Sequence, residues 1–314
     1  IYNISVGDYM KYIEEFNNKV NSSRLYPQET KDFQDQINLL LKTFFEQQSS
    51  TEKACIIGAG NLSDFSLHEF LRIFNVVTIS DVDEISMMRA LSFQRLNRQQ
   101  YKQVEIRKIE YTGFEKYDLF NSFKERFANC LNEEKINQVV EHIFKTVDAY
   151  TFFEKEFGQY DFVYVSPIYT QLLYHQISVL ADELIHSGYP QHLGVYIKEA
   201  ILQQMPPLID RFNNNLISLL KETGSMMVLS DIFELSNNSG FYRRVKNSIK
   251  RHDVMEEIYE GYKKKYGMGL GDFGLYNLDD KMKQFISRWL IWPKDDENSY
   301  IVKLKIYNNK GGTL

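Results

Sequence analysis

"ACIIGAGNLSDFSLHEFLRIFNVVTISDVD", residues 54–83, is the stretch that decides how this chain folds. A short apolar segment at its start is typical of a buried strand, and 62–74 has the apolar spacing of an amphipathic helix. The segment 76–80 is a second apolar strand, and it ends in the acidic tip Asp81 to Asp83. Gly58 and Gly60 stand between the first strand and the helix, where the backbone must turn sharply and a Cβ would obstruct a ligand.

The same alternation of strands and helices continues along the chain. Further strands are predicted at 103–109, 160–166 and 225–233, and helices at 84–96, 114–150 and 169–188. A long helical stretch then reaches about residue 222, and Pro206 and Pro207 predict a break or kink in it. Such alternation indicates a mostly parallel sheet that is covered by helices on both faces.

The two ends of the chain and one internal segment depart from this pattern. Amphipathic helices are predicted at 8–20 and 31–45, so we divide the chain into an N-terminal helical cap (1–50) and a main domain (51–314). Residues 241–285 form a polar, basic, partly helical insertion with a glycine-rich end. The apolar runs 288–292 and 300–308, joined by a short polar turn, predict an antiparallel hairpin.

Composition narrows the class of protein. The net charge is −5, which argues against bulk nucleic-acid binding, and the basic residues between Arg243 and Lys265 alternate with acids as on a solvated helix. No run approaches the ~20 apolar residues that a membrane span needs, so we expect no membrane partner. Cys55 in an apolar strand and Cys130 at a helix end do not form a disulfide framework, which favours a cytoplasmic location.

The glycine turn predicts a nucleotide-like ligand. Asp81 ends the strand beside the turn, where its carboxylate can accept both hydroxyls of a ribose, as in sites for NAD and for S-adenosylmethionine. Three features favour the second ligand. The third position of the dinucleotide fingerprint is Ser63 rather than glycine. Asp64 near the helix start would repel a pyrophosphate, and the C-terminal hairpin is unusual for a dinucleotide-binding domain.

These residues resemble class I S-adenosylmethionine-dependent methyltransferases, in particular the branch whose turn reads G-x-G-N-x-x-D-x-x-L. The resemblance implies an α/β, Rossmann-like, doubly wound sheet of seven strands, mostly parallel, with a C-terminal antiparallel hairpin. It implies S-adenosylmethionine as cofactor, with Asp81 on the ribose and Glu110 near the adenine amino group. The cofactor-binding residues expected from it are Gly58, Ala59, Gly60, Asp64, Asp81, Val82, Glu110, Tyr111, Ser166 and Pro167. One position departs from the family: the acid common two residues before the first glycine is Ile56.

The acceptor side is less specific. Ser166-Pro167-Ile168-Tyr169 resembles the Asn-Pro-Pro-Tyr loop of methyltransferases that act on planar nitrogens, so Tyr169 is a candidate for stacking on the acceptor. Alternatively, Pro167 only ends a strand. His175 is a candidate base on the following helix, and Asp231 is another at the end of a strand. Asp81 and Asp83 have no His or Cys beside them, so we expect no metal site.

We therefore expect a methyltransferase that uses S-adenosylmethionine and acts on a small molecule or a protein side chain. Transfer of the cofactor's aminocarboxypropyl group instead of its methyl group fits the same turn. An NAD-dependent oxidoreductase on the same nucleotide fold is the first alternative. The second is a non-catalytic cofactor-binding or scaffold protein, which the substitution at Ile56 motivates and which a pocket filled by side chains would support. The sequence does not indicate an oligomeric state.

Overall fold

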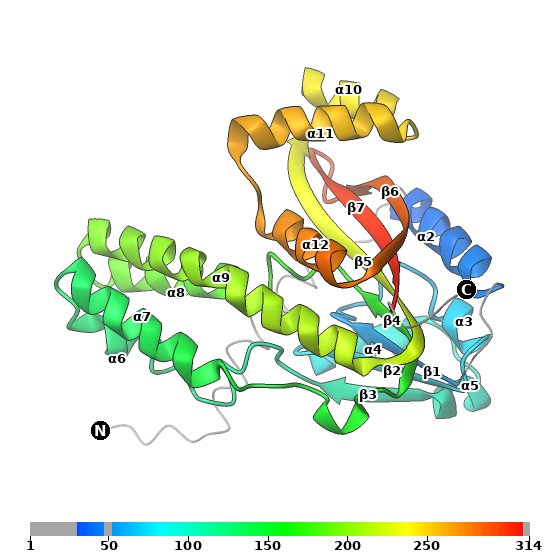
Figure 1. Cartoon of the computed structure of the whole chain (residues 1–314), viewed down its shortest axis with the longest axis horizontal. Coiled ribbons are helices and arrows are strands. Elements are labelled where there is room, and N and C mark those ends of the chain that lie inside the picture. Colours follow the sequence, from blue (N-terminus) through cyan, green and yellow to red (C-terminus); the bar gives the residue numbers. More distant parts are fainter. Residues whose placement is uncertain (1–29, 47–51, 310–314) are drawn as a thin grey trace.

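The computed structural model describes residues 30–46 and 52–309, and its centre is one seven-stranded sheet (Figure 1). The strand order is β3-β2-β1-β4-β5-β7-β6, with β7 antiparallel to both of its neighbours and the other pairs parallel. The strands are β1 (Lys53–Ile57), β2 (Val76–Asp81), β3 (Val104–Lys108), β4 (Tyr160–Val165), β5 (Leu220–Ser236), β6 (Lys283–Pro293) and β7 (Asn298–Asn308). This confirms the predicted Rossmann-like sheet and its antiparallel C-terminal hairpin.

Helices cover both faces of the sheet, because its central strands are apolar on both sides. Cys55 and Ile57 of β1 point into one core, whereas Ala54 and Ile56 point into the other. Two cores of this kind are what a doubly wound sheet requires. The helices before the insertion are α2 (Thr30–Phe45), α3 (Leu67–Leu71), α4 (Glu84–Phe93), α5 (Arg98–Gln103), α6 (Phe123–Ala128), α7 (Glu133–Val147), α8 (Tyr174–His186) and α9 (Gln191–Leu219), with a 3₁₀ turn at Glu154–Glu156.

Only the second helix of the predicted N-terminal cap, 31–45, can be compared with the structure. It is α2, and the predicted helix at 8–20 lies outside the described residues. Phe44 and Phe45 of α2 pack on Phe162 of β4, with ring centroids 5.5 and 5.0 Å apart. The apolar stripe of α2 therefore closes one face of the sheet directly.

The helix predicted over 62–74 is wrong in its extent, because α3 covers only Leu67–Leu71. Leu62 adopts a positive φ of 52°, which ends any helix at that point. The amide of Ser63 donates to Asn61 Oδ1, and Ser66 is extended as the N-cap residue. Residues 61–66 thus form an irregular turn beside the glycines, and this turn carries Asp64.

Of the break or kink predicted at Pro206 and Pro207, the break is wrong, because α9 runs through both prolines. Proline removes the hydrogen bond to the carbonyl four residues earlier, here that of Leu202 or Gln203, and both of these residues are exposed to water. In the same part of the helix, Met205, Leu208 and Ile209 are buried. The apolar contacts hold the helix together, while solvent can satisfy the two freed carbonyls.

The insertion between β5 and β6 is helical for most of its length, with α10 (Gly240–Ser248), α11 (His252–Tyr266) and α12 (Leu270–Lys281). Figure 1 shows α10 and α11 beyond the end of β5, while α12 lies back against the body of the protein. The glycine-rich stretch runs from the end of α11 into α12. Gly267 ends α11 with φ of +84°, while Gly271 and Gly274 of α12 pack closely on β5 and on Tyr169. Within the described residues, no helix combines the length and the apolar character needed to cross a bilayer.

Candidate functional site

The glycine turn lies at the carboxyl end of β1, next to the loop that follows β4. Gly58 has φ of +69° and Gly60 has φ of +47°, a left-handed conformation that a residue with a Cβ avoids. A Cβ at Gly58 would also stand 3.2 Å from Ile168 Cδ1. The amide of Ser166 donates to the carbonyl of Ile57 at 3.0 Å, so the start of the β4 loop lies directly beside the turn.

A pocket opens at this edge of the sheet, as expected for a doubly wound fold. Every residue that the sequence predicted to bind a cofactor lines it: Gly58, Ala59, Gly60, Asp64, Asp81, Val82, Glu110, Tyr111, Ser166 and Pro167. The fold therefore gathers residues from four loops in one place. Their contact with a cofactor stays a prediction.

The amides of the glycine turn are already bonded within the protein. Gly58 N–H donates to Tyr111 Oη at 3.1 Å, and Ala59 N–H donates to the carbonyl of Ser80 at 2.9 Å. Gly60 N–H donates to Asp81 Oδ2 at 2.9 Å. A pyrophosphate site needs such amides to be free. The turn is consequently shaped to carry a ligand along its surface without offering these three donors to an anion.

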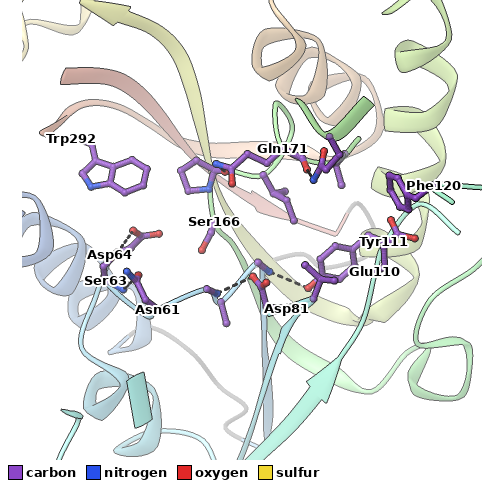
Figure 2. Close-up of a pocket in the computed structure, with 18 residues that line it drawn as sticks. Asn61, Ser63, Asp64, Asp81, Glu110, Tyr111, Phe120, Ser166, Gln171 and Trp292 are labelled. Atoms are coloured by element: carbon purple, nitrogen blue, oxygen red, sulfur yellow. Dashed lines mark hydrogen bonds between the residues drawn. The ribbon is translucent and has the colours of Figure 1, made fainter. Parts of the chain in front are cut away.

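Asp81 lies where the sequence predicted it, between the glycine turn and the tip of β2 (Figure 2). Its second oxygen, Oδ1, accepts from the amide of Asp83 at 2.9 Å. Burial raises the pKa of the Asp81 carboxyl to about 6, against the lowering effect of these backbone hydrogen bonds. At pH 7 the group is therefore mainly a carboxylate, held in place and able to accept further hydrogen bonds.

Glu110 and Tyr111 form one end of the pocket, together with Phe120 (Figure 2). The Glu110 carboxylate folds over its own turn and accepts from the amides of Thr112, at 2.7 Å, and Gly113, at 2.8 Å. Burial raises the pKa of this carboxyl, and the hydrogen bonds oppose the shift. Tyr111 is fixed by Ser80, whose Oγ lies 2.8 Å from its hydroxyl. This end of the pocket is consequently rigid.

Tyr169 is a correction to the sequence analysis, because it does not face the pocket. Its side chain is buried, and its hydroxyl donates to Asn213 Oδ1 of α9 at 2.8 Å. The ring stands edge-on to Phe212, with centroids 5.9 Å apart. Apolar surroundings and a satisfied hydroxyl make this a core residue. Stacking on an acceptor through Tyr169 is therefore not supported.

His175 and Asp231 are likewise absent from the pocket lining in the described part of the chain. His175 is exposed near the start of α8, where partial desolvation lowers the pKa of its ring and the charge of Lys294 adds to the effect. Asp231 lies inside β5 rather than at its end, since β5 continues to Ser236. The structure thus brings neither candidate base to the predicted cofactor residues.

Several lining residues were missed by the sequence analysis. Gln176 comes from the first turn of α8, and Trp292 comes from the end of β6. The Oε1 atom of Gln176 is buried and has no hydrogen-bond partner among the described residues. The ring of Trp292 stacks on Phe33 of α2, with centroids 5.8 Å apart and planes at 17°. The C-terminal hairpin therefore contributes to the pocket, and α2 packs on the ring of its Trp292.

The charges on the pocket wall have one sign. Asp64, Asp81 and Glu110 line it, whereas no Lys, Arg or His of residues 30–46 and 52–309 does so. Within the same ranges, no group of three or more His, Cys, Asp or Glu residues could hold a metal ion. Such a wall favours a ligand that is cationic or rich in hydrogen-bond donors.

Comparison with known proteins gave structural likeness only. No family model and no curated protein matches the sequence. Three similar solved structures are described as S-adenosylmethionine-dependent methyltransferases. The one from Methanosarcina mazei is 10% identical, with a TM-score of 0.39, over 85% of this chain and 96% of that one. The structure from Aquifex aeolicus is 11% identical, with a TM-score of 0.35, over 90% of this chain and 99% of that one. The structure from Leishmania major is 9% identical, with a TM-score of 0.41, over 98% of this chain and 86% of that one.

Proposed function

We propose that this protein is an S-adenosylmethionine-dependent methyltransferase whose acceptor is a small molecule or a protein side chain. The observation that carries the proposal is the pocket at the carboxyl edge of the sheet. Its glycine turn is bonded to Asp81 Oδ2, and its walls carry three carboxylates and no cationic side chain among the described residues. A sulfonium with an ammonium tail fits that charge better than a dinucleotide does.

Each part of the pocket has a role in this proposal. Asp81 accepts the ribose hydroxyls, and Glu110 with Tyr111 forms the wall at the adenine. When bound, the cofactor supplies a methyl group on a positively charged sulfur. The protein aligns the acceptor atom with that carbon and sulfur and excludes water, which is the main catalytic requirement of methyl transfer. Ser166, Gln171 and Gln176 then line the side from which an acceptor would approach.

The NAD-dependent alternative loses its support from this geometry. It would have gained if Asp64 pointed away from the pocket and the hairpin were absent, but Asp64 lines the pocket and β6 pairs with β7. In addition, the amides of Gly58, Ala59 and Gly60 are already bonded within the protein. The scaffold alternative needs a pocket filled by side chains, and ligand binding distinguishes it from the enzyme.

Titration calorimetry tests the proposal. We expect S-adenosylhomocysteine and S-adenosylmethionine to bind, NADH to give no signal, and Asp81→Ala to abolish the adenosyl signal. Binding of NADH alone would establish the oxidoreductase instead. Silence from all three ligands would remove the enzyme proposal and leave the scaffold. Once binding is shown, transfer of a labelled methyl group to candidate acceptors distinguishes methyl from aminocarboxypropyl transfer. In the second reaction the labelled methyl stays on sulfur and leaves in 5′-methylthioadenosine, so the acceptor gains no label.

A further inference from the structure

We propose that Asp64 binds the ammonium of the cofactor's amino-acid tail and replaces the acid that is missing at Ile56. The inference rests on the proposed function, since it assigns a role within the same pocket. Ile56 is fully buried and lies beside Tyr164 of β4, so this position supplies only an alkyl side chain to the core. The tail of an adenosyl amino acid therefore needs another anionic partner.

The shape of the pocket places the tail at Asp64. Figure 2 shows Glu110, Tyr111 and Phe120 at one end, Asp81 and Ser166 in the middle, and Ser63, Asp64 and Trp292 at the other end. Adenine, ribose and tail follow one another along the ligand. With adenine at Glu110 and ribose at Asp81, the tail must extend toward Asp64.

The surroundings of Asp64 suit an ammonium. Asp64 is only 7% exposed and lines the pocket, and its Oδ1 lies 3.5 Å from the hydroxyl of Ser63. The charge of Asp64 also acts on the protein interior. The pKa of the Tyr164 hydroxyl is raised mainly by burial and secondly by the charge of Asp64. A partly desolvated carboxylate gains more from an ammonium than an exposed one does.

Helix α2 holds this end of the pocket in position. Gln34 Nε2 donates to the carbonyl of Ser63 at 2.6 Å, and the amide of Ser66 donates to Asn38 Oδ1 at 2.8 Å. These two bonds fix the turn on both sides of Asp64. The same helix stacks Phe33 on Trp292, which lines the pocket at the same end. The N-terminal helix is thus a positioning element for the tail.

The test compares ligands with and without the ammonium. S-adenosylhomocysteine carries the whole tail, its desamino analogue lacks only the ammonium, and 5′-methylthioadenosine lacks the whole amino acid. In calorimetry, Asp64→Asn is expected to weaken S-adenosylhomocysteine about 10- to 100-fold and to change the affinity for 5′-methylthioadenosine less than about threefold. Asp81→Asn is the matched control, and it should weaken both ligands because both carry the ribose.

The desamino analogue makes the test independent of how the variant folds. The unmodified protein should bind the desamino analogue more weakly than S-adenosylhomocysteine. The ratio of these two affinities should equal the loss of S-adenosylhomocysteine affinity that Asp64→Asn causes. The Asp64→Asn variant should bind the two ligands equally. Equal weakening of all ligands in a natively folded Asp64→Asn, or none, would overturn the role of Asp64 while leaving the proposed function intact. Failure of the unmodified protein to bind any adenosyl ligand would instead overturn the proposed function, and this inference with it.

Discussion

Gly274 of α12 lies against the ring of Tyr169, so closely that a Cβ at Gly274 would stand 2.5 Å from the ring atoms Cε1 and Cζ. The carbonyl of Gly274 also accepts from Asn213 Nδ2 at 2.9 Å, and Asn213 accepts from the Tyr169 hydroxyl. The insertion is therefore attached to the β4 loop, and through that loop to the wall of the pocket. This contact explains why a helix contains glycine at this position.

The first prediction is that Gly274→Ala destabilises the protein. The buried ring of Tyr169 occupies the space that the new methyl group needs, so overpacking is expected to lower the free energy of unfolding by about 1–3 kcal/mol. Gly261→Ala in α11 is the matched control, because its Cβ would meet no described atom within 4 Å. There the gain in helix propensity should raise stability by about 0.5–1 kcal/mol. Urea unfolding measures both variants, and equal effects would contradict the packing argument.

The second prediction is that Tyr169 contributes to stability and not to ligand binding. Tyr169→Phe removes the hydrogen bond to Asn213 and leaves the Oδ1 of that buried residue without this donor. We expect a loss of about 1–2 kcal/mol in the free energy of unfolding. The affinity for S-adenosylhomocysteine should not change, because the ring does not line the pocket in the described part of the chain. A large loss of affinity with unchanged stability would restore Tyr169 as a ligand-facing residue.

The residues whose positions were predicted correctly are those that depend only on the order of strands and helices along the chain. Gly58, Gly60 and Asp81 follow adjacent parallel strands, and the carboxyl ends of such strands meet at one edge, so their proximity follows from β-α alternation alone. Tyr169 was misplaced because its orientation depends on Asn213 and Gly274, which come from helices far along the chain. A short loop motif carries no information about such distant partners.

Trp292 was missed for a related reason. It lies more than 200 residues after the glycine turn, and only the antiparallel pairing of β6 with β7 brings it back to the pocket. The available signal was an aromatic residue at the end of the first hairpin strand, just before the polar turn. The two prolines of α9 misled the prediction because proline propensity is local, whereas the apolar contacts that keep the helix continuous are tertiary.

The third prediction uses Trp292 as a reporter of binding. The sequence has two tryptophans, and Trp289 lies on the other face of the hairpin, where its Nε1 donates to Glu256 at 2.8 Å. In Trp289→Phe, the fluorescence of Trp292 alone should change when S-adenosylhomocysteine is added. The signal should disappear in Trp292→Phe while calorimetry still detects binding. A change of fluorescence that follows Trp289 instead would place the ligand elsewhere.

The fourth prediction concerns pH and follows from Asp81. Because burial raises the pKa of its carboxyl to about 6, protonation below that pH removes the charge that accepts the ribose hydroxyls. The affinity for S-adenosylhomocysteine should therefore decrease as the pH is lowered from 7.5 to 5. Calorimetry across this range measures the effect. Asp81→Asn should bind weakly at every pH, and a variant that keeps the full pH dependence would assign it to another group.

The same carboxyl should influence stability in the opposite direction. Its pKa is higher in the folded protein than the ordinary value of 3.8, so the folded state binds the proton more tightly than the unfolded state does. The stabilising contribution is complete below about pH 4 and is lost as the pH rises through about 6. Between pH 5 and pH 7 it decreases by about 1 kcal/mol.

Glu110 and Asp272 also have raised pKa values, so the measurement must isolate Asp81. Urea unfolding of the unmodified protein and of Asp81→Asn at both pH values does this, since only the difference between the two proteins reports Asp81. If that difference were the same at pH 5 and pH 7, the carboxyl would not be desolvated in the folded protein, and the pH dependence predicted for ligand binding would lose its basis.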